Sequence, residues 1–148
     1  MMQTRTFLSL GVIAVSLGLG VCGMALASDT ETLAAKLSGS NEVPANASSG
    51  SGELDASLDK KTSVLTWTLT YSGLTGPVKA GHFHGPALAG ANAGVALGFT
   101  GSVENPIKGS ATLTDAQVAD LMAGKWYVNL HTPANPGGEV RGQVMPSH

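Results

Sequence analysis

The chain has 148 residues, a formal net charge of −2 and only 12% charged residues. Eight Lys and Arg against ten Asp and Glu, without a basic run, argue against nucleic acid as a partner, and 5% aromatic residues leave no stacking platform for single strands. The length is typical of one domain, and 20 Gly with 7 Pro favour strands and turns over a helix bundle.

The first 27 residues have the three-part pattern of a secretory signal peptide. Arg5 provides the positive start, residues 7–21 are strongly apolar, and residues 25–27 (A-L-A) place small side chains before a cleavage point. We therefore predict a signal peptide over residues 1–27 and an exported domain over residues 28–148, periplasmic or secreted. The alternative is an uncleaved anchor, since an apolar stretch of about 20 residues can span a bilayer. Only in that case would the membrane be a partner.

Alternation of apolar and polar residues predicts short strands in the rest of the chain. The pattern is clearest in residues 63–71, where Leu65, Trp67 and Leu69 share one face and threonines share the other. Residues 32–37 predict an earlier strand, residues 54–58 a second one, and residues 41–52 a loop rich in Ser, Asn and Gly. Later strands are predicted at residues 78–84, 95–100, 109–113, 125–132 and 139–144.

One short helix is predicted near residues 114–123. Thr114 caps its start, Gln117 completes a capping box, and Gly124 ends it. About seven short strands with frequent turns predict an all-β fold, an antiparallel Greek-key β-sandwich or barrel that carries this single helix.

Three of the four histidines fall in two predicted strands. His82 and His84 are two residues apart, so their side chains leave the same face of a strand, about 6.5–7 Å apart. His131 alternates with the apolar Leu130, which directs the imidazole outward. If the two strands are neighbours, the three imidazoles form a cluster on the outer face of the sheet.

This cluster predicts a metal site with His82, His84 and His131 as ligands. Imidazole suits several transition metals, and copper(II) binds most tightly among them, so copper is the predicted ion and zinc the alternative. The single cysteine, Cys22, lies in the predicted signal peptide, which excludes thiolate ligands from the exported domain. The competing interpretation is structural: histidines beside Gly81 and the Gly-Pro pair at 85–86 can hydrogen-bond loop backbone and bind no metal.

Two further residues are expected around this cluster without contacting the metal. Asn129 shares the outward face with His131, and Arg141 is the only arginine left after cleavage. Arg141 either steers anions toward the metal or forms a structural pair with Glu139 or Asp55, and we favour the pair, because cross-strand charge pairs are common.

Elsewhere, Glu42 is expected to be buried and hydrogen-bonded within a loop. No nucleophile elbow and no HExxH motif occurs in the chain, so the sequence does not predict a hydrolase.

Several motifs resemble the CHRD domain, a family named for its occurrence in chordin. They are L-S-G-S-N-E-V-P at 37–44, G-H-F-H-G-P at 81–86, W-Y-V-N-L-H-T at 126–132 and P-G-G-E-V-R-G-Q at 136–143. Their order is that of the family, over about residues 31–144. The resemblance implies an exported protein; it does not transfer the growth-factor antagonism of chordin, whose best understood ligand contacts lie in other modules.

A more distant likeness is to copper-zinc superoxide dismutase, itself a β-sandwich. It implies that His82, His84 and His131 hold copper and that Arg141 resembles the arginine that guides the anionic substrate. No other histidine lies between His84 and His131, so the zinc subsite and its bridging imidazole look absent.

We therefore predict an exported CHRD-type domain that binds a metal ion, copper or another divalent transition metal, with an open or water-filled fourth position. The alternative is a non-enzymatic interaction or adhesion module with structural histidines, whose partner is an envelope or extracellular protein. A dismutase-like enzyme is the least favoured hypothesis, and we lean toward no enzymatic activity.

Overall fold

The computed structural model describes residues 28–148, so the predicted signal peptide lies outside the described residues. Within them no helix is long and apolar enough to cross a membrane. The chain forms, in order, β1 (Thr30–Ser38), η1 (Gly39–Asn41), β2 (Ser51–Asp59), β3 (Val64–Ser72), β4 (Ala80–His84), β5 (Val95–Gly98), β6 (Ile107–Thr112), α1 (Asp115–Met122), β7 (Trp126–His131) and β8 (Val140–Pro146).

The predicted elements are confirmed, with shifts of a few residues at their ends. The largest difference in start lies in β2, which begins at Ser51 rather than at Leu54, because Ser51 and Gly52, at the end of the predicted loop, pair with the last residues of β1. The capping box of α1 is present: the Thr114 side chain accepts from the Gln117 backbone, and the Gln117 side chain accepts from the Thr114 backbone.

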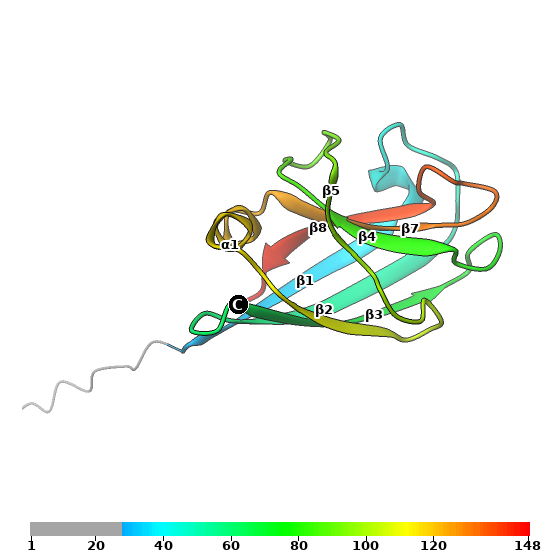
Figure 1. Cartoon of the computed structure of the whole chain (residues 1–148). Helices are drawn as coiled ribbons and strands as arrows, with labels where there is room; N and C mark the ends of the chain where they lie inside the picture. Colours follow the sequence, from blue (N-terminus) through cyan, green and yellow to red (C-terminus); the bar gives the residue numbers. More distant parts are fainter. Residues whose placement is uncertain (1–27) are drawn as a thin grey trace, which may run out of the picture.

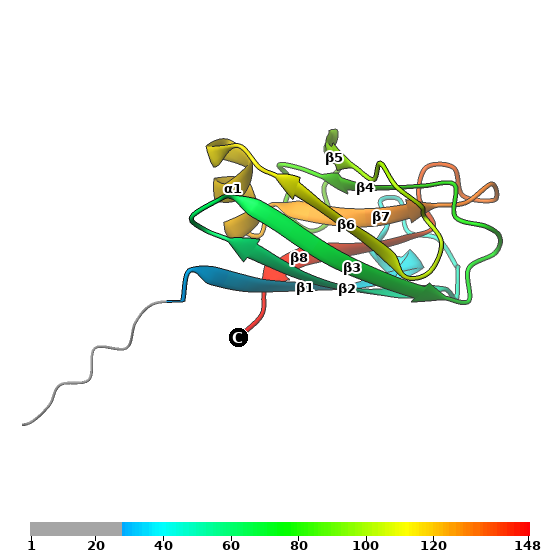
Figure 2. The ribbon, with the colours of Figure 1, turned by 60° about the horizontal axis from the view of Figure 1, so that its bottom comes forward.

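All eight strands of the described chain belong to one antiparallel sheet, in the order β5-β4-β7-β8-β1-β2-β3-β6. The sheet curls so that β4 and β7 lie over β1, β2 and β3 (Figure 1 and Figure 2). The two halves of the sheet join where β1 meets β8, which pair at three positions. At this seam Gly142 lies against the Lys36 carbonyl, and a Cβ there would lie 2.5 Å from that oxygen, so a glycine permits the close approach.

The core fills the space between the two halves of the curled sheet. Trp67 of β3 meets Phe83 of β4 edge to face, with ring centroids 5.2 Å apart, and Phe99 stacks on Trp67 from the segment after β5. Every second residue of the long strands contributes to this core, as the alternation predicted. The fold is all-β, as predicted, and the intervening residues face outward, where the histidines lie.

Candidate metal site

The three histidines come together on the outer face of two paired strands. In the antiparallel register of β4 and β7, His82 lies opposite Asn129 and Ala80 lies opposite His131. Phe83 points into the core and is fully buried, so His82 and His84 point out, and all three imidazoles are partly exposed. One ring nitrogen from each lies within 4.8 Å of the other two. The cluster therefore forms as the strand pattern predicted.

Backbone carbonyls fix the orientation of two of the rings. His131 Nδ1 lies 2.8 Å from the Pro136 carbonyl, and His84 Nδ1 lies 3.0 Å from the Ala93 carbonyl. A carbonyl oxygen only accepts, so a nitrogen beside it must carry a proton, which leaves Nε2 of a neutral ring with its lone pair. Metal-binding histidines are commonly oriented in this way. His82 Nδ1 lies 3.0 Å from His131 Nε2, so these two rings share one hydrogen bond.

Burial keeps two of the histidines neutral to lower pH. Desolvation lowers the pKa of His82 below its usual value, and the neighbouring His131 and His84 lower it further. Desolvation also lowers the pKa of His84, although hydrogen bonds with Ala93 and Asn129 oppose the shift. A metal ion needs neutral imidazole, so both shifts extend the pH range in which these rings can act as ligands.

Arg141 is locked beneath the loop of residues 85–94. Its Nη1 donates to Asn92 Oδ1 at 2.8 Å, its Nη2 donates to the Ala91 carbonyl, and the residue is 2% exposed. The guanidinium carbon lies 3.4 Å from the centroid of the Tyr127 ring, and that ring stacks on His84 with centroids 4.8 Å apart. Arg141 therefore supports the histidine cluster from behind a tyrosine.

The favoured expectation for Arg141, an ion pair with Glu139 or Asp55, is wrong. Its guanidinium instead contacts the face of one ring and donates to two loop oxygens. The expected ion pair with Glu139 or Asp55 is absent among the described residues, whose ion pairs join Lys60 and Lys61 to acidic residues of the first strand and the segment before it.

Glu139 is occupied by donors from three separate segments. It accepts from the hydroxyls of Ser48 and Thr132 at 2.6 Å and from the backbone and hydroxyl of Thr75 at 2.9 and 2.8 Å. Burial raises the pKa of Glu139, but these hydrogen bonds outweigh it and lower the pKa to about 2. The carboxylate thus ties the loop after η1 and the loop after β3 to the β7–β8 turn. Nothing in the sequence pattern of the loops indicated this role.

Asn129 and Glu42 form a buried polar pair beside His84. Asn129 Oδ1 lies 3.0 Å from His84 Nε2, and Asn129 is 3% exposed, so it lies at the cluster as expected. Glu42 is buried as predicted, but its Oε1 has no hydrogen-bond partner. Desolvation raises the pKa of Glu42, while the Arg141 charge and the Asn129 amide lower it.

The sequence pattern of the CHRD domain matches residues 33–144, which is most of the chain. The chain belongs to the CHRD domain family. The match confirms the resemblance drawn from the motifs and indicates a domain of extracellular type. No curated protein and no solved structure matches this CHRD domain, so the likeness to superoxide dismutase gains no support from either comparison.

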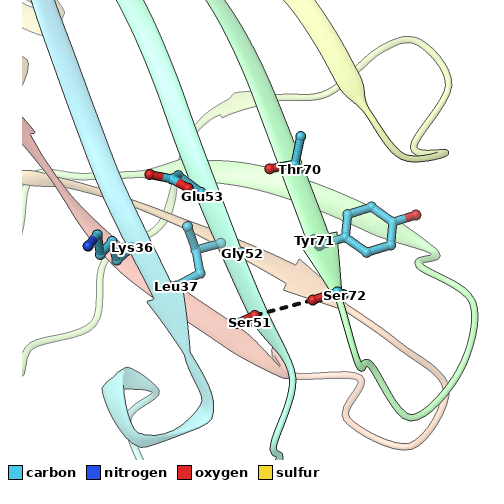
Figure 3. Close-up of a pocket in the computed structure, with 8 residues that line it drawn as sticks. All are labelled: Lys36, Leu37, Ser51, Gly52, Glu53, Thr70, Tyr71 and Ser72. Carbon is cyan, nitrogen blue, oxygen red and sulfur yellow. Dashed lines mark hydrogen bonds between the residues drawn. The ribbon is translucent and has the colours of Figure 1, made fainter.

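A broad hollow on the outer face of β1, β2 and β3 offers a contrasting surface of the CHRD domain (Figure 3). Lys36, Glu53 and Thr70 lie in register across it, and all three are exposed. The hydroxyls of Ser51 and Ser72 close one end at 3.4 Å. The lining contains no histidine and no buried charged side chain, so the chemistry of the domain concentrates on the histidine face.

Proposed function

We propose that this CHRD-domain protein is exported and binds a divalent transition metal ion through His82, His84 and His131. The observation that carries the proposal is the convergence of three imidazole nitrogens within 4.8 Å. Two of the rings have Nδ1 turned to a backbone carbonyl, so their ligand nitrogens are oriented before any ion arrives. The side chains of such a site therefore lose little conformational freedom when the ion binds.

Copper(II) is the proposed ion and zinc the alternative. Three imidazoles form a set of intermediate softness that suits both ions, and copper(II) has the higher intrinsic affinity. In the mature protein no thiolate competes, because Cys22 would leave with the signal peptide. Three ligands leave a fourth position for water or another group, which suits metal carriage or storage outside the cytoplasm, in the periplasm or as a secreted protein.

A second candidate function is protein interaction with structural histidines. The hydrogen bond of 3.0 Å between His82 and His131 closes the cluster without an ion. Leu88, Val95 and Met145 are the exposed large apolar residues of the described chain; Leu88 lies in the 85–94 loop and Val95 directly follows it. An envelope or extracellular protein would be the partner. Dismutase-like activity is the weakest candidate, because Arg141 is buried and engaged.

A copper(II) titration followed by calorimetry tests the metal proposal. We expect one ion per chain with submicromolar affinity, and a loss of at least about 100-fold in His82→Ala and in His131→Ala, which remove ligands from different strands. His148→Ala is the matched control, since His148 is exposed in the C-terminal tail. Weak binding that neither strand variant changes would overturn the proposal and favour the interaction module. A zinc titration of the same proteins ranks the two ions.

A further inference from the structure

The buried amide of Asn129 lies against the histidine cluster, where it could supply a fourth ligand. Asn129 is the residue of β7 between Tyr127 and His131 on the outward face, opposite His82 on one side and Arg141 on the other. Its Oδ1 lies 3.0 Å from His84 Nε2, the same separation as between His82 Nδ1 and His131 Nε2. The side chains of this cluster thus approach each other in two close pairs.

A neutral His84 ring cannot donate a hydrogen bond to both of the oxygens that face its two nitrogens. Nδ1 faces the Ala93 carbonyl and Nε2 faces Asn129 Oδ1, each at 3.0 Å, and both neighbours only accept. A neutral imidazole has one N–H, so one of the two contacts brings lone pair against lone pair. A cation held jointly by Nε2 and Oδ1 removes this conflict and leaves Nδ1–H to donate to Ala93.

The surroundings of Asn129 Nδ2 also favour the amide orientation in which Oδ1 faces His84. Asn129 Nδ2 and Glu42 Oε1 both lie against Gly138, whose missing side chain makes room for them. Reversing the amide would turn its oxygen toward the carboxylate of Glu42, and two acceptors would face each other there. With Oδ1 on the histidine side, Nδ2 lies on the side of Glu42, whose buried Oε1 has no hydrogen-bond partner.

We propose that Asn129 Oδ1 is the fourth ligand of the metal ion, completing a site of three nitrogens and one oxygen that selects copper(II) over zinc. This inference rests on the metal site proposed above. Ligands about 2.0–2.1 Å from an ion lie about 2.9 Å apart at right angles and about 4.1 Å apart across it, whereas tetrahedral ligands are all about 3.4 Å apart.

The observed separations fit the first pattern better. The two contacts of 3.0 Å lie closer to the roughly 2.9 Å of right-angled neighbours than to the tetrahedral value of about 3.4 Å, and the ligand nitrogens of the three histidines all lie within 4.8 Å of one another. A tetragonal set of nitrogen and oxygen ligands is the geometry of copper(II), while structural zinc prefers a tetrahedron.

Deuterium ENDOR of the copper-loaded protein in D₂O tests whether Asn129 or water fills the fourth position. We expect the parent protein to lack strongly coupled deuterons of equatorial water, and Asn129→Leu to show them, with a copper affinity about tenfold lower. Asn129→Asp keeps an oxygen at the same place and should exclude water as the parent does. Gln143→Leu is the matched control: it removes a partly buried amide that donates to the Ala87 and Gly124 carbonyls, and it should leave the spectrum unchanged.

Each outcome separates this inference from the metal site itself. Bound copper with strongly coupled water deuterons in the parent protein, unchanged in Asn129→Leu, would overturn the role of Asn129 and leave the three-histidine site intact. A parent protein that binds no copper at the histidines would overturn both. If Asn129→Leu fails to fold, the parent and Asn129→Asp spectra still decide, because the inference requires both to lack equatorial water.

Discussion

The two halves of the curled sheet present outer faces of opposite character. On β1, β2 and β3 the outward side chains, such as Lys36, Glu53 and Thr70, are exposed and solvated (Figure 3). On β7 and β8 the outward side chains Tyr127 and Arg141 are buried, because the 85–94 loop covers them. Both faces follow the same two-residue alternation, so the difference comes from the loops.

Covering a polar face with a loop changes what its side chains can do. A polar group removed from water must find partners within the protein, and these partners hold it in one geometry. Arg141, Tyr127 and His84 form a stacked series for this reason, whereas Glu53 on the open face is exposed to water. The covered face can therefore hold an oriented set of ligands, and the open face cannot.

The largest expected effect is on the free energy of unfolding, when the carboxylate of Glu139 is compared with that of Glu53 on the open face. Glu139→Gln should lower the free energy of unfolding by about 3 kcal/mol at neutral pH, because a pKa of about 2 instead of 4.5 corresponds to that much preference for the ionised form. Glu53→Gln, the matched change on the open face, should shift it by less than about 0.5 kcal/mol. Urea denaturation measures both, and equal effects would contradict the contrast between the faces.

The same carboxylate sets a pH window for stability. The folded pKa of Glu139 lies below the unfolded value, so its contribution is complete above about pH 4.5 and is lost as the pH falls toward 2. Unfolding of Glu139→Gln should therefore depend less on pH between 4.5 and 2 than unfolding of the parent. Parallel pH profiles would count against the four hydrogen bonds to Glu139.

A smaller effect is expected from Arg141→Lys, which keeps the charge but loses the planar guanidinium. Lysine cannot stack on Tyr127 while donating to both Asn92 and Ala91, so unfolding should become easier by about 1–2 kcal/mol. Amides of the 85–94 loop should exchange faster with deuterium. Lys36→Arg, on the open face, is the control and should change neither quantity. An unchanged loop in Arg141→Lys would show that other contacts hold it.

The smallest expected effect is the titration of the histidines. The pKa values of His82 and His84 lie below the usual value of 6.5, so NMR of their ring carbons should give midpoints lower than that of a free imidazole. The unfolded chain then takes up protons first as the pH falls below about 6.5, so these groups reduce stability in that range. Midpoints at or above 6.5 would show that the rings are not desolvated.

Local features of the fold could be predicted from the sequence because they depend on neighbouring residues. Alternation of Leu65, Trp67 and Leu69 indicated β3, and Thr114 with Gln117 indicated the start of α1. The common face of His82 and His84 follows from their spacing alone. That His131 joins them required the pairing of β4 with β7, which the sequence allowed but did not establish.

Loop contacts could not be predicted because they join residues far apart in the chain. Arg141 bonds with Asn92, 49 positions away, and Glu139 with Ser48, 91 positions away. Nothing in a strand pattern indicates which loop will fold over which face. A nearby charge such as Glu139 was therefore a reasonable partner for Arg141, yet the loop carbonyl of Ala91 took that place. Loop carbonyls, those of Ala93 and Pro136, also orient the rings of His84 and His131 within the cluster.

The most direct test of the metal site is a crystal structure of the copper-loaded protein with anomalous data collected at the copper edge. We predict one strong anomalous peak per chain, bonded at about 2.0–2.1 Å to one ring nitrogen each of His82, His84 and His131. A copper peak elsewhere, such as at His148, with the hydrogen bond between His82 and His131 intact, would contradict the account and make the cluster a structural feature of the sheet.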